Sequence, residues 1–142
     1  MKRKIYFVLA LAFVILFLKG NIADAGNLNA QMQSLMGKYL KDSGEKAFSA
    51  EEGKKLYFLK RMHTEKKEEI SCTSCHMDDP AKSGRTPVGK PIDPLSPAVN
   101  KERFTDPEKV EKWFKRNCTG VFERKCSPKE KGDFITYMMS LQ

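Results

Sequence analysis

The sequence predicts an all-α fold in which four helices surround one long irregular segment. Three observations support this prediction. Apolar residues recur at helical spacing in four stretches, helix-start signals precede three of them, and no strand-like alternation of any length is visible. The length of 142 residues suits one domain and excludes most multi-domain enzymes.

The first two helices are expected before residue 61. The first covers about residues 28–41, and its apolar face holds Leu28, Met32, Leu35, Met36, Tyr39 and Leu40. The second follows the capping box of Ser49 and Glu52 and ends near Lys60. Gly53 shares a face with Tyr57 in this helix. Because a helix-interior glycine costs stability, we expect Gly53 at a close contact with another helix; a tolerated glycine on a solvated face is the alternative.

The last two helices follow the irregular segment. Residues 78–102 hold five prolines and two glycines, so we expect a long loop that wraps or binds something. The third helix begins near residues 105–108, where acidic residues and a proline suit a first turn, and is expected to stop at Gly120. Its apolar stripe holds Val110, Trp113 and Phe114. The fourth begins at the Ser127–Glu130 capping box, and its apolar face holds Phe134, Ile135, Tyr137, Met138 and Leu141.

The N-terminal segment has the order of a secretory signal. A basic cluster at residues 2–4 precedes a 14-residue apolar run, residues 5–18, and the small-residue motif Ala23-Asp24-Ala25 follows. This run is shorter than the roughly 20 apolar residues that a transmembrane helix needs. We therefore expect a signal peptide at residues 1–25, cleaved after Ala25, an exported domain at residues 26–142, and a periplasmic location. An uncleaved anchor is the alternative.

One motif carries recognisable chemistry. The segment Cys72-Thr73-Ser74-Cys75-His76 has the spacing of a c-type haem attachment site. Two thiols three positions apart can add to the two vinyl groups of a porphyrin, and the following imidazole can bind the iron as proximal ligand. A thioredoxin-like pair would need a βαβ pattern, and a zinc site would need two more clustered ligands. We therefore expect one covalent haem c, with His76 as its proximal ligand.

The sixth iron ligand is harder to assign. Met77 adjoins the proximal histidine and cannot reach the opposite haem face, whereas Met32, Met36, Met138 and Met139 fall on apolar helix faces and are expected in the core. His63 is the only other histidine, and we expect it to be an exposed polar residue in a basic run rather than a ligand.

Asn117 is out of place on an apolar stripe. At 100° per residue it projects within about 20° of Val110, and such an amide needs a partner. Spacing alone favours a helix cap over an iron contact. The two cysteines that remain after haem attachment, Cys118 and Cys126, are expected to form a disulfide in an exported protein, and it would join the third helix to the fourth.

Several segments resemble the sphaeroides haem protein (SHP) family of c-type cytochromes. They are residues 71–76, 89–90, 94–97, 103–106, 110–113 and 116–118, with Cys126 and residues 130–131. The resemblance implies a small cytochrome c fold with one covalent haem and a long proline-rich loop around it. It also implies that the Asn117 side chain is the sixth ligand and that a Cys118–Cys126 disulfide adjoins it. Met77 departs from the small residue expected after the motif histidine.

The resemblance also implies a function. Family members release the asparagine on reduction and then bind small diatomic ligands, notably O2 and NO, and a dihaem cytochrome c and a membrane cytochrome b are the associated electron donors. A plain electron carrier with a fixed sixth ligand and a nitric oxide dioxygenase or reductase are the alternatives. Whether the protein is an enzyme stays open. The apolar wall of Val110, Trp113 and Phe114 would favour entry of an apolar gas.

Basic residues suggest two further roles. Lys90 or Arg103 is a candidate partner for haem propionates, with a solvated basic side chain as the alternative. An acidic redox partner could dock on a basic face formed by Lys101, Lys109, Lys112, Lys115 and Arg116, or the face is merely solvated. The chain carries a net charge of +8 and has no recognised nucleic-acid module, so we expect no nucleic-acid partner.

Overall fold

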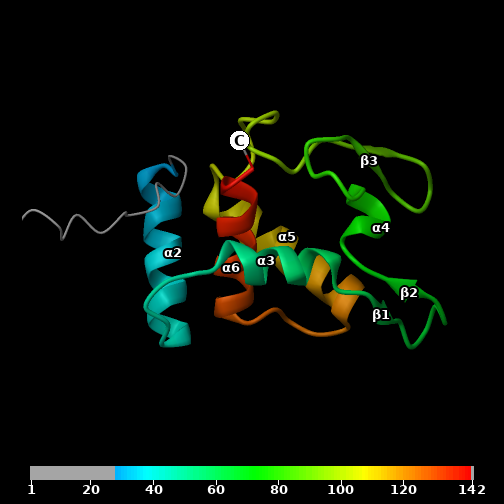
Figure 1. Ribbon diagram of the computed structural model, residues 1–142, viewed down its shortest axis with the longest axis horizontal. Coiled ribbons are helices and arrows are strands. Elements are labelled where there is room, and N and C mark those ends of the chain that lie inside the picture. Colours follow the sequence, from blue (N-terminus) through cyan, green and yellow to red (C-terminus); the bar gives the residue numbers. More distant parts are fainter. Residues whose placement is uncertain (1–27, 142) are drawn as a thin grey trace, which may run out of the picture.

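The computed structural model describes residues 28–141 (Figure 1). The predicted signal peptide and the start of the predicted domain at residue 26 lie outside the described residues. Within residues 28–141, no helix combines the length and the apolar character that a membrane span requires.

Helices dominate the described part of the chain. The longer ones are α2 (Ala30–Ser43), α3 (Ala50–Phe58), α5 (Pro107–Phe122) and α6 (Pro128–Met139), and a single turn forms α4 (Thr73–His76). Two antiparallel hairpins pair β1 (Arg61–Met62) with β2 (Glu69–Ile70), and β3 (Gly84–Arg85) with β4 (Pro91–Ile92). The mainly α prediction is confirmed. The hairpins were not expected, because two-residue strands are too short to leave an alternating pattern in the sequence.

The helices and the hairpins occupy different parts of the molecule (Figure 1). Along the longest axis, α2 lies at one end, and α4 with the β1–β2 hairpin lies towards the other. The last helix, α6, packs against both α2 and α3, and α2 also contacts α5. The long segment 78–102 loops beyond α4, carries only the β3–β4 hairpin as regular structure, and returns to α5.

The core lies where α2, α5 and α6 meet. Met32, Tyr39, Ile135 and Met138 are fully buried or nearly so, as the periodicity of the helices predicts. Of the four helix methionines predicted to be core residues, Met32 and Met138 are therefore confirmed as such, and Met36 and Met139 are partly buried and pack against the cluster that contains Met32.

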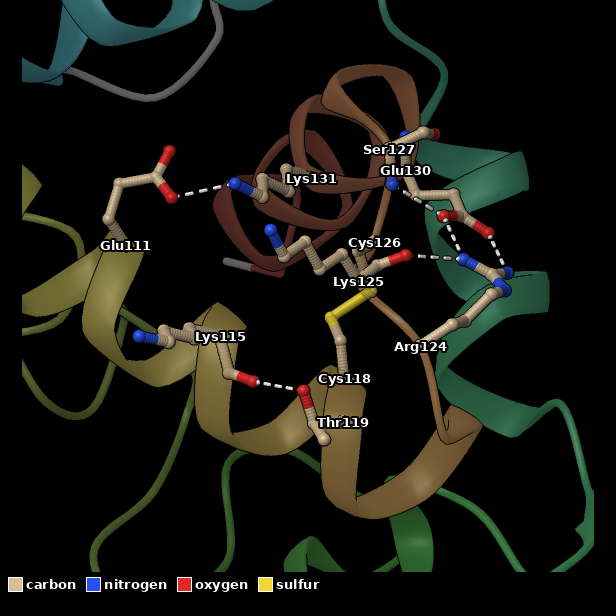
Figure 2. Close-up of a disulfide and its surroundings, with 10 residues drawn as sticks. All are labelled: Glu111, Lys115, Cys118, Thr119, Arg124, Lys125, Cys126, Ser127, Glu130 and Lys131. Carbon is tan, nitrogen blue, oxygen red and sulfur yellow. Dashed lines mark hydrogen bonds and ion pairs between the residues drawn. A yellow bond between two sulfur atoms is a disulfide. The ribbon is translucent and has the colours of Figure 1, made fainter.

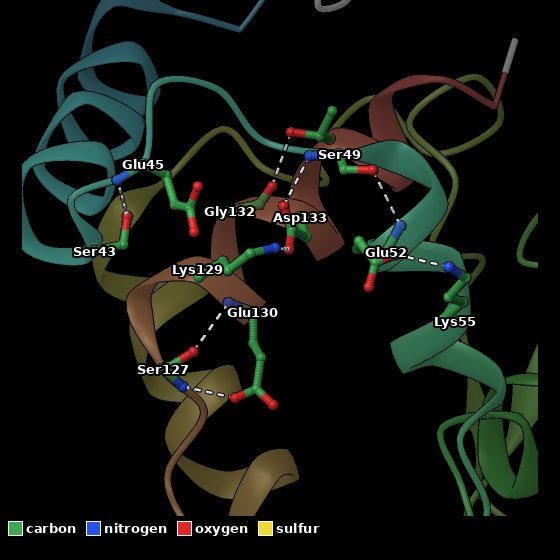
Figure 3. Close-up of polar contacts among 11 residues, drawn as sticks. Ser43, Glu45, Ser49, Glu52, Lys55, Ser127, Lys129, Glu130, Gly132 and Asp133 are labelled. Carbon is green, nitrogen blue, oxygen red and sulfur yellow. Dashed lines mark hydrogen bonds and ion pairs between the residues drawn. The ribbon is translucent and has the colours of Figure 1, made fainter.

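Side-chain caps define the helix starts, and one of them differs from the prediction (Figure 3). Ser127 and Glu130 form the complete reciprocal capping box at the start of α6. Ser49 caps α3 by accepting from the Glu52 amide, but its own amide donates to the Asp133 carboxylate at 2.8 Å. The predicted capping box would have the Glu52 side chain accept from the Ser49 amide. Asp133 of α6 takes that place, and this hydrogen bond joins the two helices.

The third predicted helix ends later than expected. Gly120 does not stop α5, which continues to Phe122 and ends at Glu123 in the left-handed conformation, with φ of 55°. The Glu123 carboxylate accepts hydrogen bonds from the amide and the hydroxyl of Thr64. A contact with the β1–β2 hairpin therefore fixes the helix end, although glycine is the residue that usually adopts this backbone conformation.

The expectation that His63 is exposed is wrong. Its exposed fraction is 6%, and its Nδ1 atom accepts from the amides of Glu65 and Lys66 in the turn between β1 and β2. Glu123 lies beside the ring, with Oε1 3.6 Å from Nδ1. His63 therefore helps to join the hairpin to the end of α5.

Candidate cofactor site

The Cys72–His76 motif forms the single helical turn α4. The amide of His76 donates to the carbonyl of Cys72 at 3.0 Å, and Ser74 accepts from the amide of Ser71 at 3.0 Å, so the turn is closed at its N-terminal side. Cys72 and Cys75 are free and half-buried. Because residues three apart share a helix face, the turn presents both thiols on one side.

Two neighbours hold the turn from outside the motif. The Tyr57 hydroxyl of α3 lies 2.6 Å from the Met77 carbonyl oxygen and 3.1 Å from that of His76. A Cβ at Gly84 of β3 would lie 1.9 Å from the Cys75 carbonyl oxygen, so only glycine permits this approach. Neither role could be predicted from the sequence. Tyr57 and Gly84 lie outside the motif, and both contact backbone carbonyls rather than side chains of the motif.

The protonation states of the motif suit haem binding. Burial, helped by the Arg103 charge, lowers the pKa of His76 to about 4, so its imidazole is neutral at neutral pH and has a free lone pair. Burial raises the pKa of the Cys72 thiol to about 12. A redox-active cysteine pair needs a thiolate of lowered pKa, so this environment argues against a thioredoxin-like site.

A cavity of about 910 Å³ opens beside the motif. It is near the upper end of the range typical of ligand sites, so it suits a large cofactor. It is bounded by α4, the segment 86–95, residues 102–106, α5 and α6. Every residue that the sequence predicted for cofactor binding lines it, namely Cys72, Cys75, His76, Lys90, Arg103, Trp113 and Asn117.

Asn117 lies in the cavity wall and is not a helix cap. It is exposed, and α5 continues for five residues beyond it, with Glu123 as the capping residue. Within residues 28–141 its amide makes no hydrogen bond, so it is available to a bound group. The capping alternative is therefore wrong, because the helix does not end at Gly120.

Trp113 differs from its predicted place on a buried stripe. Val110 and Phe114 are buried, but Trp113 keeps an exposed fraction of 43% and lines the cavity. The guanidinium of Arg116 lies over its ring, 5.3 Å from the centroid. This pair forms a cationic, aromatic edge of the cavity that the apolar pattern of α5 did not reveal.

The two predicted propionate partners have different surroundings. The Arg103 guanidinium is half-buried and donates to the backbone carbonyls of Pro94 and Asp93, at 2.8 and 2.7 Å. It is thus fixed against the cavity by the long loop. Lys90 is exposed at the β3–β4 hairpin, where its backbone amide and carbonyl are hydrogen-bonded to Thr86 and its ammonium group makes no hydrogen bond among the described residues. Arg103 is therefore the better ordered cation of the two.

A disulfide joins Cys118 and Cys126 next to Asn117 (Figure 2). The two Cα atoms lie 5.6 Å apart, and both residues are buried and line the cavity. The bond connects α5 to the segment that leads into α6, and Arg124 pairs with Glu130 in the same region. The residue that precedes Cys118 therefore sits on a covalently tethered part of α5.

The wall of the cavity suits a flat, largely apolar group that carries acidic side chains. Leu56, Val110, Phe114, Phe122 and Phe134 supply apolar surface, Arg103 supplies a fixed cation, and the two thiols lie in the same turn as a neutral imidazole. This donor set fits covalent haem c held by Cys72, Cys75 and His76. His63, in contrast, is not among the lining residues. Fold and site together define a c-type cytochrome.

Comparison with known proteins supports this class. A family model described as a domain of unknown function (DUF1924) matches residues 43–138. Cytochrome c'' from Methylophilus methylotrophus is 42% identical over 87 residues, which cover 61% of this chain and 60% of that protein. The cytochrome c-type protein SHP from Cereibacter sphaeroides is 44% identical over 89 residues, which cover 63% of this chain and 68% of that protein.

Solved structures give the same result. The crystal structure of oxidised cytochrome c'' from Methylophilus methylotrophus matches with a TM-score of 0.67 and 37% identity, covering 77% of this chain and 93% of that one. The structure of oxidised SHP, an oxygen-binding cytochrome c, matches with a TM-score of 0.69 and 36% identity, covering 80% and 97%. The chain belongs to the DUF1924 family and to the SHP/cytochrome c'' family of c-type cytochromes.

Proposed function

We propose that this protein is a periplasmic monohaem cytochrome whose sixth iron ligand, the amide of Asn117, leaves on reduction and opens the site to a diatomic gas, O2 or NO. The sequence holds one CxxCH motif, which supports a count of one haem. The predicted signal peptide supports the periplasmic location. The oxygen binding that is described for SHP supports the choice of ligand.

The observation that carries the proposal is the position of Asn117. It lines the same cavity as His76, and it makes no hydrogen bond to the rest of the described chain. A haem attached at Cys72 and Cys75 supplies an iron that changes between the ferric and ferrous states. An amide oxygen is a hard and weak donor, so it binds ferric iron better than ferrous iron. Reduction therefore favours release of Asn117, whereas a methionine thioether would stay bound.

The surroundings of Asn117 favour a small apolar ligand. Val110 and Phe114, about two turns and one turn before it on α5, line the cavity with Trp113. The Cys118–Cys126 disulfide tethers the backbone next to Asn117, so we expect release to occur by rotation of the side chain. The relative whose solution structure concerns haem-ligand detachment, cytochrome c'' from Methylophilus methylotrophus, matches this chain with a TM-score of 0.66 and 37% identity.

Electrons would come from partner cytochromes, with a dihaem cytochrome c and a membrane cytochrome b as the expected donors. The exposed edge of the cavity carries Lys109 and Arg116, and Lys112 and Lys115 extend the positive charge along α5. Among the described residues, Lys112, Lys115 and Arg116 form no ion pair. Such a surface would attract an acidic partner and speed its association.

The ferric and ferrous optical spectra of the purified holoprotein, with and without CO, test the proposal. We expect a low-spin ferric spectrum, a five-coordinate high-spin ferrous spectrum, and a shift of the ferrous spectrum on addition of CO. A low-spin ferrous spectrum that CO does not change would show a plain electron carrier with a fixed sixth ligand. Conversion of NO to nitrate or nitrous oxide with a reductant would instead show an enzyme.

A further inference from the structure

The C-terminal end of the haem motif has an unusual backbone. Met77, directly after His76, has φ of 64° and ψ of 170°, a region that is almost confined to glycine. Its amide donates to the Thr73 carbonyl at 3.1 Å as the last bond of α4, but its side chain is about half exposed, and a residue with a Cβ is strained in this region. A conformation of this kind persists only where the surrounding structure holds it in place.

Tyr57 supplies that hold. Its hydroxyl has a single hydrogen, and the Met77 carbonyl oxygen at 2.6 Å is the nearer of its two acceptors; the His76 carbonyl oxygen lies at 3.1 Å. The Tyr57 side chain is fully buried, which fixes the position of its hydroxyl. One phenol group therefore holds the Met77 carbonyl and lies against the His76 carbonyl, directly after the imidazole-bearing residue.

The hold is rigid because Tyr57 belongs to the helical core. It lies on α3, which packs along α6, and its ring contacts those of Phe134 and Tyr137 with centroids 6.3 and 6.0 Å away. On the other side of the turn, Gly84 lies against the Cys75 carbonyl. The turn α4 is thus held between the helical core and the β3–β4 hairpin.

We propose that Tyr57 is a positioning residue for the proximal ligand: its hydroxyl holds the Met77 carbonyl and thereby fixes the direction from which the His76 imidazole meets the iron. This inference rests on the proposed role of His76 as the proximal ligand. It adds a reason why the distal side responds to reduction. If the backbone of the proximal histidine is held by the core, the bond between His76 and the iron changes little on reduction. The weaker bond to Asn117 is then the one that breaks.

The test is Tyr57→Phe, which removes the hydroxyl and keeps the ring. The frequency and width of the iron–histidine stretching band of the ferrous holoprotein, measured by resonance Raman spectroscopy, report the orientation and strain of His76. We expect the band to shift and broaden, together with a shift in midpoint potential. The matched control is Tyr137→Phe, because the Tyr137 hydroxyl makes no hydrogen bond within residues 28–141 and its ring touches that of Tyr57. This control should leave the band unchanged.

A second variant tests the mechanism of the effect. Glycine adopts the Met77 conformation without strain, so the hydroxyl should matter less in a Met77→Gly background. We expect Tyr57→Phe to shift the band less in that background than in the wild type. If Tyr57→Phe prevents haem attachment, the comparison is made between Met77→Gly and the double variant, and a band shift between these two still supports the proposal.

Two results would overturn the inference, and they differ from a failure of the proposed function. A melting temperature lowered by Tyr57→Phe with the same band and the same potential would make the hydroxyl a structural contact only. Equal band shifts for Tyr57→Phe and Tyr137→Phe would assign the effect to the helix interface. If the wild-type ferrous protein lacks an iron–histidine band because it is six-coordinate and low-spin, it is the release of Asn117, and with it the proposed function, that fails, and the midpoint potential then remains the test of Tyr57.

Discussion

Gly53 of α3 lies directly against the backbone carbonyl of Asp133 in α6. A Cβ at position 53 would lie 2.0 Å from that oxygen and 2.8 Å from the Cβ of Tyr137. The Asp133 carboxylate also accepts from the Ser49 amide at 2.8 Å, so the two helices are joined at the start of α3 as well (Figure 3). The close contact predicted for Gly53 is therefore confirmed, and it sets the position of Tyr57 one turn later.

Gly53→Ala should destabilise the protein, because the atom that a Cβ would meet is backbone and cannot turn aside. We expect the free energy of unfolding of the holoprotein to fall by about 1–3 kcal/mol, measured by chemical denaturation. Gly37→Ala is the control: it lies in α2 with no atom within 4 Å of its Cβ position, and should gain about 0.5–1 kcal/mol. Equal stabilities of Gly53→Ala and Gly37→Ala would show that the contact between α3 and α6 tolerates a methyl group.

Glu111 should make stability depend on pH. Burial alone would raise its pKa, but the hydrogen bonds from Lys131 and Tyr39, at 2.6 and 2.5 Å, with the Lys131 charge, lower it below the usual 4.5. A lowered pKa means that the stabilisation is fully present above about pH 4.5 and is lost as the pH falls through the folded-state pKa.

We therefore expect Glu111→Gln to be less stable than the wild type at neutral pH, with the difference shrinking as the solution is acidified. Denaturant unfolding at a series of pH values measures it. Glu65→Gln, in the β1–β2 turn, is the control, since its exposed carboxylate accepts no hydrogen bond among the described residues. A gap between Glu111→Gln and wild type that stays constant down to acid pH would contradict the assignment.

Local signals were enough to predict the helices. The capping residues Ser49, Asp106 and Ser127 all start helices in the structure, because a cap depends only on the next few residues. The end of α5 was predicted wrongly at Gly120, because Thr64, which lies 59 residues from Glu123 in sequence, fixes that end. Such a contact leaves no trace in local periodicity.

The same distinction applies to the site. The CxxCH motif is contiguous, so it could be read directly. Helical phase placed Asn117 on the apolar stripe of α5, but spacing alone favoured a helix cap, and only the resemblance implied a role at the iron. Tyr57 and Gly84 could not be assigned, because each acts through a backbone carbonyl of another segment. The one available signal was indirect: Gly53 and Tyr57 share a helix face, which placed Tyr57 at a close helix crossing.

Removing the disulfide should cost stability. Cys118 and Cys126 are separated by eight positions, and a loop of that size corresponds to about 2–3 kcal/mol in the chain-entropy model. We expect the double variant Cys118→Ala/Cys126→Ala to lose about this much on denaturation. The comparison is repeated with a thiol reductant, which should destabilise the wild type and leave the double variant unaffected. Equal responses of the two proteins would show that the bond does not contribute.

Asn117→Val should affect the ferric and the ferrous protein differently. Valine is close to asparagine in size but has no donor atom for iron, so the ferric spectrum should change from low-spin towards high-spin. The ferrous protein should bind CO as the wild type does, because under the proposed function Asn117 leaves the iron in that state. Thr119→Val, two residues later on the exposed side of α5, is the control and should leave both spectra unchanged. An unaltered ferric spectrum in Asn117→Val would show that Asn117 is not an iron ligand.

Charge reversal on α5 should slow electron delivery. Lys112 and Lys115 are exposed, and neither forms an ion pair among the described residues, so they contribute little to folding. With a dihaem cytochrome c as donor, we expect Lys112→Glu/Lys115→Glu to lower the second-order rate of reduction at low ionic strength. The rates of variant and wild type should converge as salt rises, because screening removes long-range attraction.

The control for this prediction is Lys46→Glu, which changes an exposed charge in the loop between α2 and α3. If the rate depends on overall charge only, this single reversal should give half the effect of the double one on a free-energy scale. A smaller effect from Lys46→Glu would locate the docking surface on α5, beside the cavity edge formed by Trp113 and Arg116. Rates that are the same for all three proteins at low salt would rule out electrostatic docking there.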